Sequence, residues 1–218
     1  MTSRARHPGP VVESMLDLVG GTPLIKLSKL APPGGSEVWA KLELHNPSGS
    51  IKDRPALAMV DAAEREGLLK PGGTLVEATS GNTGISLAMI AAVRGYRCVL
   101  VMPEDMSLER RYILKAYGAE VVLTPALEGM RGAVKRAQEL LARIPGAWMP
   151  RQFENPNNPR AHGASTALEI LEQTGGQLAA FVAGAGTGGT LTGVGRVLRE
   201  QLGRQVRIVA VEPAASAV

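Results

Sequence analysis

Cysteine and aromatic residues are scarce in this sequence of 218 residues, which holds one cysteine and 3% aromatics. A single cysteine, Cys98, excludes a framework of intrachain disulfides and fits a reducing compartment. Because its neighbours YRCVLVM predict a buried strand, we interpret Cys98 as a packing residue and not as a nucleophile. No run of Lys and Arg alternates with Tyr or Phe, which argues against a nucleic-acid-binding surface.

Metal-ligand spacing and long apolar runs are absent as well. The three histidines, His7, His45 and His162, lie far apart in the sequence, so no metal site is expected. No apolar run approaches the roughly 18 residues that a membrane span needs. The basic residues 1–10 are followed by no apolar segment, so they predict a loose tail and not a secretory signal. We expect a cytoplasmic protein without membrane association.

What is present is an alternation of short β-branched runs with helical patterns. The expected strands are residues 37–43, 74–78, 97–102, 120–124, 178–184 and 206–212. The expected helices are residues 54–66, 82–94, 108–117, 128–142, 161–173 and 189–201, and glycines follow three of them as C-terminal caps, at Gly67, Gly95 and Gly118. This order predicts an α/β fold of mostly parallel sheets with helices on both faces. Ligands of such folds bind at the carboxyl ends of the strands.

The stretch 146–163 interrupts this alternation with prolines, asparagines and glycines, and we interpret it as a crossing between two lobes. After the tail, we predict that residues 11–39 belong to a larger lobe and residues 40–150 to a smaller one. Residues 151–218 then return to the larger lobe. Since the sequence stops just after a strand, we expect this C-terminal lobe to be incomplete.

The segment NPSGSIKDRPA places a lysine where a helix is expected to begin. Gly49 and Ser50 predict a turn, while Asp53 and Pro55 are typical of a first helical turn. Lys52 then lies at the positive end of the helix dipole, where a cation is disfavoured by roughly 0.3–1 kcal/mol. Two interpretations remain open, a surface cation beside Asp53 and an amine whose pKa is lowered for reaction with an aldehyde.

A first loop rich in small polar residues, TSGNTG, follows the expected strand 74–78 directly at a helix start. Its two glycines let backbone N–H groups point outward, and its Thr, Ser and Asn side chains add donors. This combination favours an anion site for a carboxylate or a phosphate. The alternative is ordinary capping of the helix by one of these side chains.

A second loop, GAGTGGT, follows the expected strand 178–184 and also opens onto a helix. It matches G-x-G-x-x-G at Gly184, Gly186 and Gly189, and Glu212 ends the next strand near where a dinucleotide fold places its ribose ligand. A nicotinamide or flavin nucleotide is therefore one interpretation. The others are a single phosphate group held by the same backbone donors, and a turn without a ligand.

Taken together, an activated lysine, a phosphate-binding loop and a carboxylate-binding loop fit a pyridoxal phosphate enzyme that acts on an amino acid. Four segments also resemble the cysteine synthase (O-acetylserine sulfhydrylase) family, in the β-family or fold type II of pyridoxal phosphate enzymes: GGTPLIKL, NPSGSIKDR, TSGNTGISLAMIAAVRGY and GAGTGGTLTGVGR. The similarity runs from about Val11 onward. The segments GSEVWAKLELHNPSGSIKDRPALAMV and MPEDMSLERR favour the B-type isozyme.

This resemblance implies roles for individual residues. Lys52 matches the lysine that joins the aldehyde of the cofactor and later moves the α-proton. Asn82 matches the residue that hydrogen-bonds the ring oxygen of the cofactor. The cofactor phosphate is assigned to Gly186, Thr187, Gly188, Gly189 and Thr190, and the substrate carboxylate to Thr79, Ser80, Gly81, Asn82, Thr83 and Gln152. The polar partner of the pyridine nitrogen is expected beyond the end of this chain.

The reaction implied is a β-replacement in which O-acetyl-L-serine loses acetate through an α-aminoacrylate intermediate and sulfide, or another sulfur donor, adds to give L-cysteine. Resemblance also implies a homodimer. Cystathionine β-synthase and a serine or threonine dehydratase of the same fold remain alternatives. Outside the class, a nucleotide-binding oxidoreductase and an inactive family member remain open.

Overall fold

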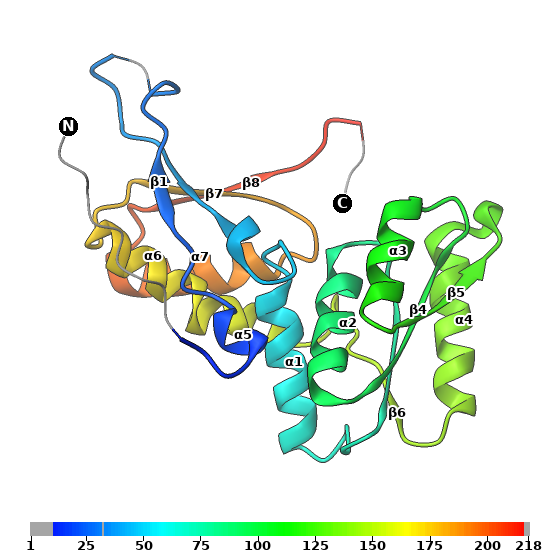
Figure 1. The fold of residues 1–218 in the computed structure, drawn as a ribbon. Helices are drawn as coiled ribbons and strands as arrows, with labels where there is room; N and C mark the ends of the chain where they lie inside the picture. Colours follow the sequence, from blue (N-terminus) through cyan, green and yellow to red (C-terminus); the bar gives the residue numbers. More distant parts are fainter. Residues whose placement is uncertain (1–10, 32, 216–218) are drawn as a thin grey trace.

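The computed structural model describes residues 11–31 and 33–215, so the predicted tail and His7 lie outside the described residues. Two groups of helices and strands stand side by side (Figure 1), and α1 (Asp53–Arg65) lies between them. Helix α1 packs against α2 (Asn82–Arg94) of one group and against α5 (Asn157–Ala164) of the other. A residue at the start of α1 is therefore held by both groups.

The first group is built on a sheet of four strands in the order β5-β4-β3-β6, all of whose neighbours pair in parallel. Parallel neighbours need a crossover, and helices α2, α3 and α4 provide the crossovers. The bounds are β3 (Thr74–Ala78), β4 (Arg97–Pro103), α3 (Leu108–Ala116), β5 (Glu120–Thr124), η3 (Ala126–Glu128), α4 (Gly129–Arg143) and β6 (Ala147–Trp148).

The alternation of side chains along β3 and β4 divides the core of this group into two layers. Leu75, Cys98 and Leu100 pack with α1 and α2 on one face of the sheet. Val76 and Val99 pack with α4 on the opposite face. The sheet is thus covered by helices on both sides, as its near-continuous apolar strands predict. Cys98 is buried, as expected for a packing residue, and burial raises the pKa of its thiol to about 12.

The second group contains a pair of parallel strands, β7 (Ala180–Gly184) and β8 (Arg207–Val211), with α5, α6 (Thr166–Thr174) and α7 (Gly189–Leu202). Helices α6 and α7 bury a small core of their own against this pair. An antiparallel pair, β1 (Leu24–Lys26) and β2 (Trp39–Lys41), is connected to this group by the ion pair between Lys41 and Glu169 of α6. The short helices η1 (Met15–Leu18) and η2 (Glu43–His45) flank this pair in sequence.

Three expectations from the sequence are corrected here. The helix expected at 161–173 is two helices, α5 and α6, because Ser165 leaves helical geometry at φ −129° and ψ −71°. The expected strand 37–43 shrinks to β2, which pairs with β1, a strand that the sequence analysis did not predict. The crossing at 146–163 is not wholly irregular, since it contains β6 and all but the last residue of α5.

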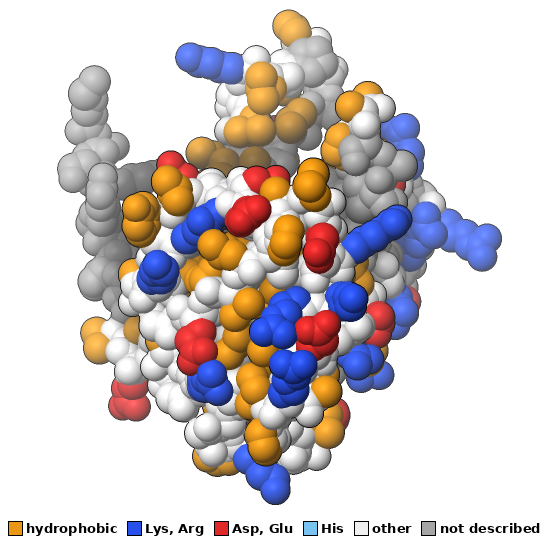
Figure 2. Space-filling view, turned by 90° about the vertical axis from the view of Figure 1, so that its right-hand side faces the viewer, with side chains coloured by type: hydrophobic (Ala, Val, Ile, Leu, Met, Phe, Trp, Pro, Cys, Tyr) orange, Lys and Arg blue, Asp and Glu red, His pale blue; other side chains and the backbone are white. Residues whose placement is uncertain are grey.

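The remaining helix starts lie within one or two residues of the expected ones, and α2 begins and ends as predicted. Gly67, Gly95 and Gly118 all have positive φ, which is the geometry expected of glycines that end helices. No helix in the described part of the chain is long and apolar enough to cross a membrane. The face seen in Figure 2 carries Lys and Arg side chains with Asp and Glu between them.

Candidate active site

Lys52 is the N-cap residue of α1, directly before Asp53, so the predicted helix start is confirmed. Its side chain is half-buried, and this burial lowers the pKa of the ammonium group. A lowered pKa makes the free amine, which is the nucleophilic form, more available near neutral pH. The interpretation of Lys52 as an ordinary surface cation is therefore disfavoured.

Asp53 anchors this helix start to the neighbouring helix. Its fully buried carboxylate accepts hydrogen bonds from the Ser48 N–H at 2.7 Å and from the Ser86 hydroxyl at 2.5 Å. The Ser48 hydroxyl also donates to it. Ser86 lies one turn after Asn82, at the start of α2. The contact therefore fixes Lys52 relative to the first turn of α2, where the TSGNTG loop ends.

The TSGNTG loop connects the carboxyl end of β3 to α2. The buried Thr79 hydroxyl accepts the Gly81 N–H at 3.2 Å, and the Ser80 carbonyl accepts a bond from Arg110 at 2.9 Å. Gly81 is the N-cap of α2, while Asn82 is exposed as its first residue. The Gly84 N–H donates to the Gly81 carbonyl at 3.0 Å, so in the described part of the chain the N–H groups of Asn82 and Thr83 are those at the start of α2 without a backbone acceptor, as a site for an anion requires.

Thr83 and Gln152 meet although 69 positions separate them in the sequence. The Thr83 hydroxyl donates to the Gln152 Oε1 atom at 2.6 Å, and both residues are buried. The hydroxyl hydrogen of Thr83 is thus engaged, and its backbone N–H is the group left for a ligand. On Gln152, the Nε2 group remains as a donor.

The second loop brings Thr187 and three glycines to the start of α7. Gly188 is the N-cap, at φ 76°, a left-handed conformation that glycine adopts without strain. The Thr187 Oγ1 atom accepts hydrogen bonds from the Asn158 Nδ2 group at 2.9 Å and from the Gly189 N–H at 3.3 Å. Because these bonds use its lone pairs, the Thr187 hydroxyl hydrogen is left to donate to an anion.

Asn158 connects the two loops, a function that the sequence analysis missed. Its Nδ2 group donates both to the Gln152 carbonyl at 2.9 Å and to Thr187. Its Oδ1 atom is buried without a partner in the described part of the chain and would lie 2.0 Å from a Cβ at position 189. A side chain at position 189 would therefore displace the Asn158 amide. The Asn-rich run FENPNNP was the available signal, but it was interpreted only as a crossing.

His162 also supports the second loop. Its Nε2 lies 3.3 Å from the Thr190 hydroxyl, and its Nδ1 lies 3.0 Å from the Thr166 hydroxyl. Burial, together with the positive charges of Lys52 and Arg54, lowers the pKa of this histidine to about 4. His162 is therefore neutral at physiological pH, and its contact with Thr190 joins the loop to the surroundings of Lys52.

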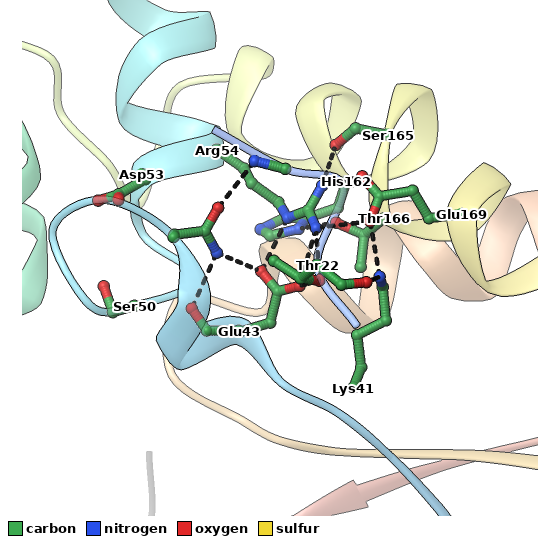
Figure 3. Close-up of polar contacts among 12 residues, drawn as sticks. Thr22, Lys41, Glu43, Ser50, Asp53, Arg54, His162, Ser165, Thr166 and Glu169 are labelled. Carbon is green, nitrogen blue, oxygen red and sulfur yellow. Dashed lines mark hydrogen bonds and ion pairs between the residues drawn. The ribbon is translucent and has the colours of Figure 1, made fainter. Parts of the chain in front are cut away.

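An ion-pair network around Arg54 fixes α1 at the junction of the two groups (Figure 3). Arg54 contacts Glu43 at 2.7 Å and Glu169 at 2.5 Å, and Lys41 contacts Glu169 at 2.6 Å. Burial opposes the ionisation of Glu169, but hydrogen bonds from Arg54 and Lys41 outweigh it and hold the pKa at about 2. The charges of Lys41 and Arg54 thus balance those of Glu43 and Glu169. This neutral network lies close to Lys52, because Arg54 follows Lys52 by two residues in the sequence.

Named contacts connect the segments that carry the predicted site residues. Asp53 and Ser86 join Lys52 to the first loop, and Asn158 joins Gln152 to the second loop. The segments so linked carry Lys52, Thr79, Ser80, Gly81, Asn82, Thr83, Gln152, Gly186, Thr187, Gly188, Gly189 and Thr190. Glu212 follows β8, on the side of the β7–β8 pair where the second loop begins, and is exposed.

Residues 15–218 match the sequence profile of a family described as "Pyridoxal-phosphate dependent enzyme". The chain belongs to this family. It is 53% identical to a cysteine synthase of Staphylococcus aureus (strain N315) over 208 residues, which cover 95% of this chain and 66% of that protein. A probable cysteine synthase of Bacillus subtilis (strain 168) is also 53% identical, over 95% of this chain and 68% of that protein.

Solved structures of the family have the same fold. The crystal structure of O-ureido-L-serine synthase matches with a TM-score of 0.90 at 50% identity, over 95% of this chain and 65% of that one. The cysteine synthase of Entamoeba histolytica matches with a TM-score of 0.92 at 40% identity, over 100% of this chain and 65% of that one. The predicted two-lobed fold type II architecture is confirmed. The chain spans just under two thirds of the length of several of these relatives.

The residues present fit the cofactor of the family, pyridoxal phosphate. The start of α7 offers backbone N–H groups and the Thr187 hydroxyl to a phosphate, and a Cβ at position 189 would displace the Asn158 amide that donates to Thr187. Lys52 offers an amine of lowered pKa to an aldehyde. Among the described residues, no group of three or more His, Cys, Asp or Glu side chains is arranged to hold a metal ion.

Proposed function

We propose that this chain has the pyridoxal phosphate-binding residues and the activity of a cysteine synthase, which makes L-cysteine and acetate from O-acetyl-L-serine and sulfide or another sulfur donor. The observation that carries the proposal is the run of hydrogen bonds from Thr83 through Gln152 and Asn158 to Thr187. It joins a carboxylate-binding loop to a phosphate-binding loop beside one activated lysine. Identity of 53% to two cysteine synthases supports the substrate class.

In this proposal each loop binds one charged end of the reacting molecule. Gly186, Thr187, Gly188, Gly189 and Thr190 hold the cofactor phosphate, through N–H groups at the start of α7 and the Thr187 hydroxyl. The substrate carboxylate lies at the start of α2, against the segment from Thr79 to Thr83 and the Nε2 group of Gln152. Asn82, exposed at the first position of α2, is available to hydrogen-bond the ring oxygen of the cofactor.

Lys52 is the group that moves the proton. When bound, pyridoxal phosphate stabilises the negative charge that develops at the substrate Cα once its proton leaves. A neutral Lys52 amine accepts that proton, and burial favours the neutral form. Asp53, held by Ser48 and Ser86, positions the helix start that carries Lys52. Neutral His162 adds no positive charge to the surroundings of Lys52, so it does not lower the basicity of the amine.

The test is product formation by the chain supplied with pyridoxal phosphate. We expect L-cysteine and acetate from O-acetyl-L-serine and sulfide, loss of this activity in Lys52→Ala, and none of that loss in Lys70→Ala, which changes an exposed lysine. Formation of cystathionine from serine and homocysteine would instead indicate a cystathionine β-synthase. Formation of an α-keto acid from serine or threonine would indicate a dehydratase. O-ureido-L-serine as the main product would assign the chain the activity of its structural neighbour.

Three finer expectations belong to the same proposal. A homodimer predicts a molecular mass in solution twice that of the chain, measurable by light scattering. A cytoplasmic location predicts recovery in the soluble fraction of the source cell. The third, the B-type isozyme, leaves the sulfur donor open, and product formation with sulfide and with thiosulfate, each supplied alone, identifies the donor.

A further inference from the structure

We propose that Glu77 is a positioning residue, which holds the turn at Arg151 and Gln152 so that the Gln152 amide faces the substrate carboxylate. The inference rests on the proposed function and extends its carboxylate site by one residue. Glu77 lies in β3, one residue before the strand ends, and is 5% exposed. A carboxyl buried this deeply in a sheet requires hydrogen-bond partners.

The partners of Glu77 are backbone N–H groups of the turn. The Glu77 Oε2 atom accepts the Arg151 N–H at 3.0 Å. The Gln152 N–H also favours the ionised carboxyl. Burial nevertheless dominates and raises the pKa of Glu77 to about 7. The charged groups that face it, Arg151 and Glu154, have opposite signs and act against each other.

The turn that Glu77 holds has an unfavourable backbone. Arg151 is the one non-glycine residue in the described part of the chain with a positive φ, at 52°. Residues with a Cβ adopt this left-handed region only where the surroundings impose it. Here the Glu154 and Asn155 N–H groups donate to the Arg151 carbonyl at 2.9 and 3.0 Å, and the Arg151 N–H donates to Glu77, which is the side-chain acceptor of the turn. Without that acceptor, we expect the turn to relax and Gln152 to move.

Gln152 is fixed at three points, and Glu77 provides the first of them. The N–H of the preceding residue, Arg151, donates to Glu77, the Gln152 carbonyl accepts from Asn158, and its side-chain Oε1 accepts from Thr83. Because Thr83 donates to the Oε1 atom of Gln152, the Nε2 group of the same amide is the one left to donate to the ligand. This orientation lasts only while the backbone at Gln152 stays in place. Glu77 thus acts through Gln152 and does not itself touch the substrate.

The test compares Glu77→Gln with Gln152→Ala and with a matched control, Glu120→Gln, on β5. A glutamine at 77 has one acceptor oxygen in place of two and brings an NH2 group toward the N–H donors of the turn, so it holds the turn less tightly. Hydrogen exchange of the Arg151 and Gln152 amides should then become about tenfold faster or more, whereas Glu120→Gln should leave these amides unchanged. Glu77→Asp, which keeps the charge but withdraws the carboxyl, should act in the same direction if Glu77→Gln does not fold.

Kinetics of the full chain with pyridoxal phosphate supply the second measurement. Glu77→Gln should raise the KM for O-acetyl-L-serine about tenfold with kcat changed less than about threefold, and it should add little to the effect of Gln152→Ala. Unchanged amide exchange and KM in Glu77→Gln, beside a raised KM in Gln152→Ala, would overturn the positioning of Gln152 by Glu77. An unchanged KM in Gln152→Ala would instead reject the carboxylate site itself, whatever the amide exchange shows.

Discussion

At the scale of single residues, two buried titratable groups have pKa values displaced in opposite directions. Burial raises the pKa of Glu77 to about 7 and lowers the pKa of His162 to about 4. Both groups are therefore neutral in the folded protein at pH 5.5, while in the unfolded chain both are mainly charged. Their contributions to the pH dependence of stability oppose each other.

The sign follows from which state binds the proton. The folded protein keeps the Glu77 proton up to about pH 7, but the unfolded chain releases it near pH 4.5. The contribution of Glu77 to the free energy of unfolding is thus present at low pH and lost as the pH rises to 7. For His162, the contribution is present above about pH 6.5 and lost as the pH falls to about 4. Each shift corresponds to about 3 kcal/mol.

We predict that Glu77→Gln removes the first of these contributions alone. The difference in free energy of unfolding between the protein and this variant should change by about 3 kcal/mol between pH 4.5 and 7.5, in favour of the variant at the higher pH. Urea unfolding at a series of pH values measures it. A difference that stays constant with pH would show that Glu77 titrates as an ordinary exposed carboxyl.

The sequence was enough to predict that Lys52 and the two glycine-containing loops belong to the site, because glycines and helix starts are recognised from neighbouring residues alone. It did not reach Asp53, Asn158 or His162 as parts of the site. Each of these acts through a contact that is distant in sequence, and a hydrogen bond between α5 and the second loop leaves no periodicity to detect. Thr83 was predicted as a side-chain donor to the ligand, but its hydroxyl is engaged by Gln152.

At the scale of elements, α5 and α7 approach so closely that glycine is needed at their crossing. A Cβ at Gly193 would lie 2.1 Å from the Pro159 carbonyl oxygen and 2.9 Å from the Gly163 N atom. Both are backbone atoms, which cannot move aside alone. At Gly163, in the same interface, a Cβ would meet nothing closer than 3.4 Å. Gly163 therefore has room for the methyl group of an alanine, and Gly193 does not.

We predict opposite effects for the same substitution at these two positions. Gly193→Ala should lower the free energy of unfolding by about 1–3 kcal/mol or more through overpacking. Gly163→Ala should leave it unchanged or raise it by up to about 1 kcal/mol, because alanine favours the helix. Thermal and urea unfolding of the two variants decide the matter. Equal losses in both would mean that α5 and α7 pack differently.

The sequence predicted most elements of the parallel sheet because the strands are apolar and the helices end in glycine. It failed where tertiary contacts decide the local structure. Ser165 breaks the expected helix while its hydroxyl accepts a hydrogen bond from Arg54 at 3.2 Å and donates to the Ala161 carbonyl at 2.8 Å. The asparagines and prolines at 155–159 suggested a loop, yet Pro159 lies within the first turn of α5, where its missing N–H costs nothing.

At the scale of the whole molecule, Arg54 is the residue that ties the two groups together through α1. Its side chain is 1% exposed, and its carboxylate partners belong to η2 and α6. Breaking a buried ion pair by removing one partner leaves the other charge unpaired and typically costs 3–5 kcal/mol. The orientation of the Lys52 helix therefore depends on this network.

We predict that Arg54→Ala lowers the free energy of unfolding by about 3–5 kcal/mol. Arg97→Ala, which removes an exposed pair with Glu120, should change it by no more than about 1 kcal/mol. Urea unfolding of both variants at one pH measures the contrast. If Arg54→Ala were as mild as Arg97→Ala, the network would not hold the two groups together. The predicted lobe boundaries at residues 39 and 150 stay predictions.

The central claim is that Lys52 is the residue that attaches pyridoxal phosphate. The most direct measurement is reduction of the cofactor-loaded chain with borohydride, followed by mass mapping of its peptides. The account predicts the mass of the reduced cofactor on the peptide that contains Lys52, with none on peptides containing Lys41 or Lys70. The added mass on another lysine, or on none in a protein that binds the cofactor, would contradict it.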